Sequence, residues 1–391
     1  MPHRWPALFA AAVAFMAAQG FGRFGFALIL PSMRDGLGLS NGEMGLMAGI
    51  GLAAYLLSSA PIGVLAAWFG TRRVVVGGLL GIAAGLAGTG LAEGFAMAAA
   101  AQALVGAASP GVIVPVLAAG TAWFPPSVHG RVTGLVVGGG GLGVLTTGLV
   151  VPLLLGTGDE SAWRRAWGSL ALGTLAASLL VALLLRDPPA VGSATARPSL
   201  GAVYRSAAVW RLGIVFGLYA VAYIVYGTFF AAHLAQRGVD GVTAGRLWSL
   251  VGVASIGSGL LGGVLADRLG SSLALAAMFA MEGTGLALLA LGDGLAWYAV
   301  SAIFFGASFW GFPSAISKAC AEIVGPALAP AAIGLLAVFF GVGQVVGPVV
   351  GGLLADWTGA LSAALLLGAA ADLAGAVGSL LLPQRMVDGK Q

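Results

Sequence analysis

Charged residues are scarce in this chain. Asp, Glu, Lys and Arg make up only 8% of its 391 residues, whereas 59% are hydrophobic. So few charges could not cover the surface of a water-soluble protein of this length. Apolar runs long enough to cross a bilayer recur from the first residues to Leu382. We therefore expect an all-α polytopic membrane protein embedded in a lipid bilayer.

Cysteine is almost absent as well. Cys320 is the only one, which excludes a disulfide within one chain and a metal site of the CxxC type. No phosphate-binding loop, Ser/His/Asp set or metal-ligand cluster appears, so we expect neither an enzyme nor a cofactor nor a metal. The basic residues stand singly at predicted loops, so the formal charge of +4 does not indicate nucleic-acid binding. The 65 glycines indicate closely packed helices, and the alternating strands of an outer-membrane barrel are missing.

Twelve apolar segments have about the twenty residues that a membrane helix needs. They cover residues 7–30, 44–67, 74–92, 95–121, 132–155, 166–185, 209–234, 244–265, 272–291, 295–317, 330–354 and 360–382. The first has no small-residue cleavage site followed by a soluble domain, so it is predicted to remain as a helix. With the N-terminus inside, twelve Lys and Arg lie in inner loops and five in outer loops. This asymmetry predicts cytoplasmic termini, in the plasma (inner) membrane of a prokaryote.

An internal repeat with an offset of 200 residues runs through the chain. The matching positions are 63–66 with 263–266 (both GVLA), Gly70 with Gly270, 106–107 with 306–307, Gly111 with Gly311, Gly134 with Gly334, and Gly143 with Gly343. The longest polar gap, residues 186–208, lies between the two copies. We expect an N-terminal six-helix bundle over 1–185, a cytoplasmic linker over 186–208 and a C-terminal six-helix bundle over 209–391. Two parallel six-helix repeats are the arrangement of the major facilitator fold, with a substrate site at mid-membrane between the halves.

Two loops resemble the major facilitator loop signature of glycine, acid, base and glycine. The C-terminal copy has Gly263, Asp267, Arg268 and Gly270, and the N-terminal copy has Gly63, Gly70, Arg72 and Arg73. The resemblance implies that the acid caps a neighbouring helix end and locks one conformation. Ala67 stands at the acid position of the first copy, which argues against a lock there. A short basic turn that obeys the positive-inside rule is the alternative.

A second motif lies in the eleventh segment. Gly347-Pro348, with glycines on either side, resembles the glycine-proline motif that antiporters of the superfamily carry in their fifth span. Here the motif stands in the pseudo-equivalent helix. Glycine allows helices to approach closely and proline lets a helix bend, so plain tight packing is the alternative to an antiport role.

The opening segment resembles one branch of the superfamily. Residues 22–24 (GRF), 30–33 (LPSM), 36–40 (GLGLS) and 162–167 (AWRRAW) look like the YbfB/YjiJ branch. The superfamily resemblance covers the whole chain, whereas the branch resemblance depends on about thirty residues. It implies membrane transport and leaves the substrate open.

Arg23 is the only Lys or Arg well inside an apolar segment. A charge at that depth costs at least about 2.5 kcal/mol unless it has a partner or a water-filled cavity. Its repeat equivalent is Tyr223, and helical spacing places polar and aromatic residues on the same face of both helices. We expect the cavity to be lined by Gln19, Arg23, Phe26, Tyr219, Tyr223, Tyr226, Phe230, Phe305, Ser308 and Gln344. The alternative is that these residues pack against neighbouring helices and line no cavity.

The predicted cavity holds a positive charge and no acid, which favours an anion over a cationic substrate. Arginine binds two oxygens of a carboxylate with its planar fork, so a small organic carboxylate is the leading hypothesis. Proton coupling is expected, with His233, Glu282 and Asp372 as the titrating candidates, and the protein is expected to be a monomer. Efflux of a neutral or amphipathic compound by antiport is the first alternative. A non-transporting receptor or scaffold is the second.

Overall fold

The computed structural model describes residues 4–124, 128–156, 159, 161–187, 200–325 and 328–382, and helices form nearly all of these ranges. Backbone polar groups inside a bilayer must be paired within the protein, and a helix pairs them within its own segment. The elements are α1 Arg4–Phe15, η1 Met16–Phe24, α2 Gly25–Leu37, α3 Asn41–Phe69, α4 Thr71–Gly90, α5 Phe95–Ala108, α6 Pro110–Ala122, α7 His129–Leu155, α8 Ala162–Leu184, α9 Leu200–Arg205, α10 Ala207–Gln236, α11 Gly241–Ile256, α12 Ser258–Leu269, α13 Ser271–Leu291, α14 Leu295–Phe309, α15 Gly311–Val324, α16 Ala329–Thr358 and α17 Leu361–Leu380.

The predicted membrane helices are confirmed. Within the described ranges, 10 helical stretches are long and apolar enough to cross a membrane, and the pair α11 and α12, bent by 45°, brings the number to 11. The twelfth expected span, residues 44–67, lies in the 29-residue helix α3, where four side chains fall outside the described set. The expected linker 186–208 also falls partly outside it and contains the short helix α9.

Three spans are broken near their middle. The span over residues 95–121 breaks at Ser109: α5 ends at Ala108 and α6 begins at Pro110, which has no N–H to donate. The equivalent span of the second repeat breaks at Trp310, between α14 and α15. The two breaks, at Ser109 and Trp310, therefore fall within one residue of the repeat offset. The third break is the bend between α11 and α12 at Gly257.

The first span contains a stretch of π-helix, η1, which includes Arg23. The N–H of Gly25 bonds to the carbonyl of Gly20, five residues back, where an α-helix bonds four residues back. Gly20 also lies directly against α7, since a Cβ there would come within 2.3 Å of the Cα of Gly143. The sequence predicts a regular helical face through 19–30, and the wider turn of η1 changes its register.

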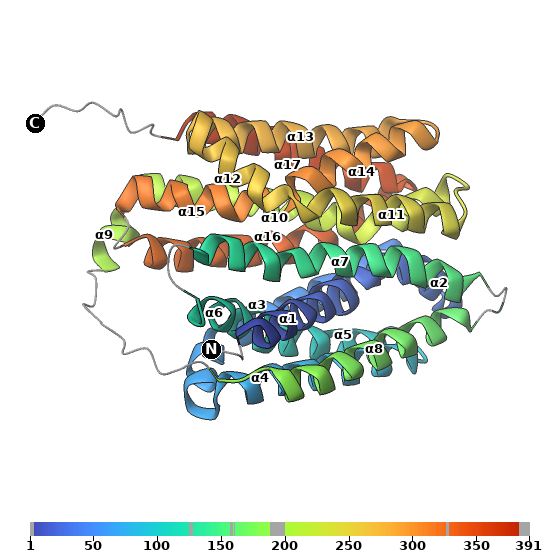
Figure 1. Cartoon of the computed structure of the whole chain (residues 1–391). Coiled ribbons are helices and arrows are strands. Elements are labelled where there is room, and N and C mark those ends of the chain that lie inside the picture. The colour runs from blue at the N-terminus through green and yellow to red at the C-terminus, as the bar shows by residue number, and fades with distance from the viewer. Residues whose placement is uncertain are drawn as a thin grey trace, which may run out of the picture.

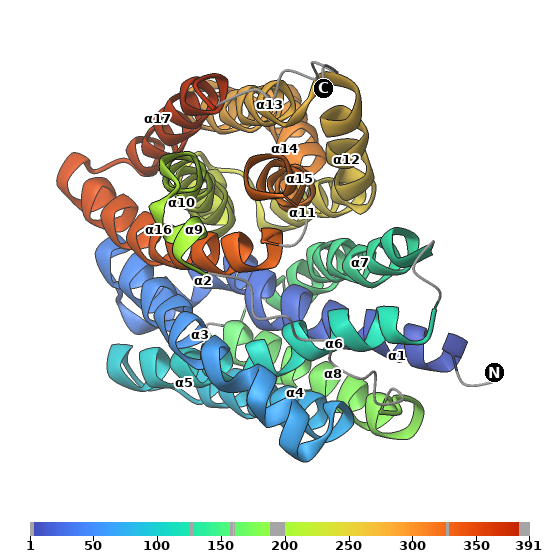
Figure 2. The same ribbon diagram turned by 90° about the vertical axis from the view of Figure 1, so that its left-hand side faces the viewer.

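Figure 1 shows α1–α8 mainly below and α10–α17 mainly above, with α1 beginning and α17 ending on the left. We call this the terminal side, and the other end, with the α2–α3 and α16–α17 turns, the far side. Figure 2 views the molecule from the terminal side, with α3 beside α16 and α7 beside α11. These two helix pairs join the N-terminal helices to the C-terminal ones.

The contacts in these pairs are closest toward the far side. A Cβ on Gly45 of α3 would lie 2.0 Å from the carbonyl oxygen of Pro348 on α16. Asp356, near the end of α16, accepts hydrogen bonds from the backbone N–H groups of Asn41 (3.0 Å) and Gly42 (2.6 Å). A carboxylate at a helix N-terminus is favoured by the helix dipole and by the unpaired N–H groups. The far side is therefore closed by backbone packing and by an acid that bridges the two sets of helices.

Candidate functional site

Arg23 contacts its own repeat equivalent. Its Nη2 donates a hydrogen bond of 2.6 Å to the hydroxyl of Tyr223, one repeat offset along the chain. Residues related by a pseudo-twofold axis touch each other only near that axis. Gln344 on α16 also donates from Nε2 to the Tyr223 hydroxyl. The guanidinium thus lies at the centre of the molecule, where the two repeats meet.

Aromatic rings surround the Arg23 guanidinium. Its carbon lies 5.6 Å from the ring centre of Tyr55, 5.8 Å from that of Tyr223 and 5.9 Å from that of Phe24. Cations are attracted to the faces of such rings. Among the ion pairs of the described residues, none involves Arg23. Its charge is therefore stabilised by ring faces and a phenol, and no carboxylate of those residues lies within 4.0 Å.

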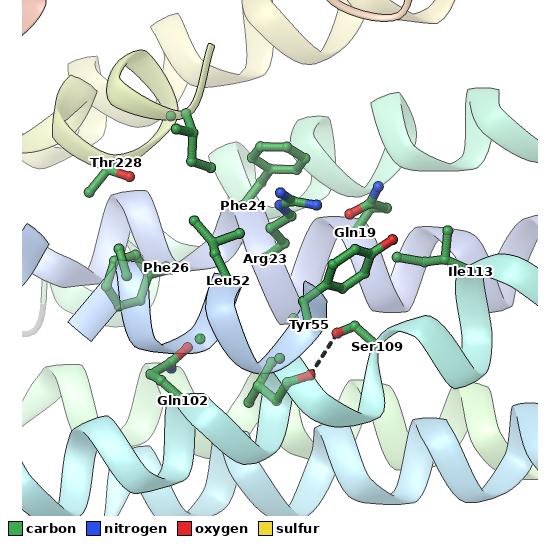
Figure 3. A pocket seen from close by; sticks show the side chains of 17 residues that line it. Gln19, Arg23, Phe24, Phe26, Leu52, Tyr55, Gln102, Ser109, Ile113 and Thr228 are labelled. Atoms are coloured by element: carbon green, nitrogen blue, oxygen red, sulfur yellow. Dashed lines mark hydrogen bonds between the residues drawn. The ribbon is translucent and has the colours of Figure 1, made fainter. Parts of the chain in front are cut away.

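A cavity opens beside this arginine, between η1, α2, α3, α5, α6 and α10 (Figure 3). Its volume is about 60 Å³ on a scale on which one water needs about 10–15 Å³. The Nε of Arg23 and the Oε1 of Gln19 are buried and find no hydrogen-bond partner in the described ranges. The lining residues are Gln19, Gly22, Arg23, Phe24, Phe26, Ala48, Gly51, Leu52, Tyr55, Gln102, Val105, Gly106, Ser109, Ile113, Ile224, Gly227 and Thr228.

Five of the residues expected at the site meet there. Gln19, Arg23 and Phe26 line the cavity, and the hydroxyl of Tyr223 accepts hydrogen bonds from both Arg23 and Gln344. These five come from the first, seventh and eleventh spans. The three residues of the first span line the cavity although η1 interrupts the regular helix.

The other expected lining residues lie among the C-terminal helices, away from the cavity lining. Tyr219 donates to the carbonyl of Phe309 (2.6 Å), and Tyr226 bonds to Ser301 (3.0 Å) and stacks on Phe305 at 3.8 Å between ring centres. Ser308 donates to Glu282 (3.1 Å). Phe230 packs against Trp248. These side chains thus pack between helices, which is the alternative that the sequence analysis left open.

The three candidate proton carriers also lie outside the cavity lining. His233 is buried toward the far-side end of α10, near Arg237. Glu282 on α13 and Asp372 on α17 are both fully buried. The structure thus separates the charge of Arg23 from every acid and histidine that the sequence proposed for proton coupling.

Four polar lining residues escaped the sequence-based selection: Tyr55, Gln102, Ser109 and Thr228. Two carry a signal that could have found them. Tyr55 is the only tyrosine before residue 204, and Gln102 places an amide in the middle of an apolar span. A polar group at such a depth indicates an inward-facing position.

The loop-motif residues form local contacts on the terminal side. Gly70 and Gly270 have φ of +83° and +79°, a conformation that only glycine adopts without strain. The N–H of Arg72 donates to Asp187 (2.8 Å), so an acid from the end of the N-terminal bundle caps α4. Asp267 pairs with Lys318 on α15 at 3.0 Å.

The remaining motif residues occupy the same turns or the far-side contact. Gly63 lies in α3 and Gly263 in α12, each in the last turns before the glycine that starts the next helix, and Arg73 and Arg268 flank those turns on the terminal side. Gly347 packs against Val221 of α10, and the carbonyl of Pro348 meets Gly45 of α3. The glycine-proline motif is therefore a tight packing site between three helices.

The family model described as "Uncharacterised MFS-type transporter YbfB" matches residues 15–380. The chain belongs to this family of major facilitator transporters. The resemblance drawn from the opening segment is confirmed, and the family to which the chain belongs is one of transporters and not of enzymes. As a transporter with apolar spans throughout, it is an integral membrane protein.

Curated relatives carry names of several transported compounds. The chain is 28% identical to the 2-nitroimidazole transporter of Escherichia coli (strain K12), over 61% of this chain and 60% of that one. It is 30% identical to Monocarboxylate transporter 11 of Homo sapiens, over 65% and 56%. It is 25% identical to the "Probable sulfoacetate transporter SauU" of Cupriavidus necator, over 92% and 89%. The match thus spans about 60% of the length of the first two relatives.

Solved structures confirm the major facilitator fold of this transporter. A bacterial homologue of the human lysosomal transporter Spinster, crystallised in an inward-facing and occupied conformation, superposes with a TM-score of 0.74 at 17% identity, covering 98% of this chain and 96% of that one. A point mutant of the nucleoside transporter NupG gives 0.79 at 16% identity, covering 96% and 100%.

Proposed function

We propose that this transporter moves a small organic carboxylate, coupled to protons, by alternating access around Arg23. The observation that carries the proposal is the guanidinium itself. It lies at the contact between the two repeats, borders a cavity and pairs with no acid in the described ranges. Rocking of the two repeats about that contact would expose the same site to either side of the membrane.

The charge of Arg23, which lacks an acidic partner in the described part of the chain, favours an anion. A cationic substrate would be repelled by the guanidinium, whereas a carboxylate would supply the counter-charge. The free Nε of Arg23 is a donor in the plane of the fork that binds carboxylates with two parallel hydrogen bonds. The amide of Gln19 borders the same space and is a second polar group for the substrate.

The size of the cavity favours a substrate with few atoms. A volume of about 60 Å³ accommodates about four to six waters on the same scale. The compounds in the names of the relatives, 2-nitroimidazole, monocarboxylates and sulfoacetate, are all small. Each carries a nitro, carboxylate or sulfonate group whose oxygens a guanidinium fork can bind.

The closed far side determines how the substrate enters this conformation. Backbone packing at Gly45 and the bridge from Asp356 block that end, so exchange would take place from the terminal side. With the terminal side in the cytoplasm, as the distribution of Lys and Arg predicts, we propose that this conformation is inward-facing, in a monomer in a prokaryotic plasma membrane.

Uptake into proteoliposomes tests the proposal, with radiolabelled sulfoacetate and a panel of short monocarboxylates as probes. Losing one hydrogen bond to a charged group costs about 1.5–3 kcal/mol, or roughly 10- to 150-fold in affinity. We expect Arg23→Gln to weaken uptake by that factor, and Arg23→Lys to keep part of it because the charge remains. Arg34→Gln is the matched control, since Arg34 lies on the same span but pairs with Asp35 at the surface.

One observation favours a second candidate, efflux of a neutral or amphipathic compound. The guanidinium already has a phenol and three ring faces as neighbours, so Arg23 could hold helices together without touching the substrate. The same assay separates the two functions. Anion transport that is unchanged in both Arg23 variants would reject the carboxylate and favour the efflux function.

A further inference from the structure

Two carboxyl groups lie inside the C-terminal helices, away from the Arg23 cavity. Glu282 on α13 and Asp372 on α17 are both 0% exposed, and α13 packs along α17. A Cβ on Gly283, the residue after Glu282, would lie 3.0 Å from the Cβ of Asp372. Asp372 also interacts electrostatically with Glu282, so the two acids lie near each other inside the protein. Figure 1 shows their helices, α13 and α17, side by side.

These carboxyl groups have few partners. One oxygen of Glu282 accepts a hydrogen bond from Ser308 (3.1 Å). The other oxygen of Glu282 and both oxygens of Asp372 have no hydrogen-bond partner within the described ranges. No Lys, Arg or His of that part of the chain comes within 4.0 Å of either acid. Two ionised carboxylates in such a place would lack both solvent and counter-charge.

The described helices packed around the pair bring no cation to it. Tyr219 and Tyr226 of α10 are the titratable side chains that interact with Glu282. On α15, Lys318 is turned to Asp267 of α12. The only acid of α16 is Asp356, which is bound to α3 at the far side. The sequence of α14 has no charged residue.

We propose that Glu282 and Asp372 together form the proton-binding site that couples to transport. The step is simple: a proton from water adds to a carboxylate oxygen to give a carboxylic acid, and it leaves again when the site opens to water. A neutral acid can donate its O–H to the neighbouring carboxyl, which satisfies an oxygen that is otherwise unpaired. This inference rests on the proposed proton-coupled transport and assigns its proton to a place apart from the substrate.

The break between α14 and α15 connects the carboxyl pair to the substrate site. Ser308, which bonds to Glu282, immediately precedes Phe309. The carbonyl of Phe309 accepts a hydrogen bond from Tyr219. The centre of the Phe309 ring lies 5.2 Å from that of Phe24 and 5.6 Å from that of Tyr223. A change in the Ser308 hydrogen bond therefore reaches the rings beside Arg23 through one residue.

The break also contacts the opposite repeat and is held locally by a side chain. The N–H of Trp310 donates to the hydroxyl of Ser258 on α12 (3.0 Å), and the ring of Trp310 lies 6.0 Å from that of Phe15 on α1. Protonation of Glu282 would weaken the hydrogen bond that it accepts from the Ser308 hydroxyl, since a neutral acid is a poorer acceptor than a carboxylate. We expect the break to shift and to alter this contact between the repeats.

Distances between spin labels report which side of the transporter is closed. Cys320 is the only native cysteine, so Cys320→Ala gives a background for labelling. One label pair, Leu91 and Leu291, lies on the far side, and each residue is 68% exposed. The other pair, Phe69 and Leu269, lies on the terminal side with 54% and 47% exposure. Both pairs are separated by the repeat offset, so each spans the two repeats.

The test follows both distances from pH 8 to pH 5 in the full-length transporter in lipid nanodiscs, without ligand. We expect the label distances of the wild type to change with pH, as the protein moves between the conformation closed on the far side and the one closed on the terminal side. The double variant Glu282→Gln with Asp372→Asn should show no such change at either label pair. His233→Asn is the control and should keep the change. A wild type without a shift, a double variant that keeps it, or loss of the shift in His233→Asn would overturn the inference.

Infrared difference spectroscopy keeps the inference testable if the double variant does not fold. The wild type at pH 7 should show the carbonyl band of a protonated carboxylic acid, weakened by each single amide variant. A missing band would overturn the inference. The pH experiment uses no substrate, so loss of the pair's role leaves the Arg23 result untouched, and an Arg23→Gln variant with normal uptake would reject the carboxylate without affecting the pH shift.

Discussion

Replacing Gly45 with alanine should open the far side of the transporter. Gly45 faces Pro348 and Gly352 on α16, and a Cβ there would lie 2.0 Å from the Pro348 carbonyl oxygen and 3.3 Å from the Cα of Gly352. Ordinary van der Waals contact begins at about 3.4 Å. Both neighbours are backbone atoms, so no side-chain rotation can remove the overlap, and α3 must move away from α16.

The size of the effect follows from overpacking. Inserting a methyl group into a packed contact costs about 1–3 kcal/mol. The gain in helix propensity from glycine to alanine, about 1 kcal/mol, is present in both conformations and cancels. The steric cost applies only where the far side is closed, so that conformation should lose population by about 5- to 150-fold relative to the open one.

The far-side label pair Leu91 and Leu291 measures this change. We expect Gly45→Ala to move the distance distribution toward longer values. Gly134→Ala on α7 is the matched control, because a Cβ there meets nothing within 4 Å while the gain in helix propensity is the same. Superimposable distributions for the two variants would show that the Gly45 contact does not hold the far side closed.

Three further predictions concern polar contacts. Tyr223→Phe removes the hydroxyl that accepts from Gln344 and Arg23, and leaving buried donors unpaired should cost about 1–3 kcal/mol, seen as a lower midpoint in thermal unfolding; an unchanged midpoint contradicts this. Asp356→Asn replaces a charged acceptor of two backbone N–H groups with an amide, so the far-side label distance should lengthen, and an unaltered distance would count against the bridge. The hydrogen bond from Arg165 lowers the pKa of Asp159 to about 2, so any stabilisation by this acid is complete above about pH 4 and lost as the pH falls toward 2. The difference in melting midpoint between wild type and an Asp159→Asn variant should therefore stay constant from pH 7 to pH 5 and shrink below pH 4.

Much of the fold could be predicted from the sequence because each step depends on local patterns. Apolar runs of about twenty residues identify membrane helices, since the bilayer demands internal backbone pairing. Ser109-Pro110 predicts the break of the fourth span, because proline has no N–H. The repeat offset places Arg23 and Tyr223 at equivalent positions.

The candidate site was predicted less completely. Helical spacing identifies the residues on one face of a helix, but not which other helix packs against that face. Tyr219, Tyr226 and Tyr223 share one face of α10, yet only Tyr223 reaches Arg23, while the other two bond to groups of α14. Tyr55 and Gln102 reach the cavity from spans in which the sequence showed no stripe. Which helix a face meets depends on packing angles between helices far apart in the chain.

Composition, the 200-residue offset and the family motifs are enough to identify a transporter of two six-helix repeats with one arginine deep in the membrane, since all three can be read from the chain alone. They do not predict that Arg23 meets its own repeat equivalent, or that Glu282 and Asp372 lie together behind the α14–α15 break. A contact across 90 or 200 residues depends on how whole helices pack against one another, and no local pattern specifies that packing.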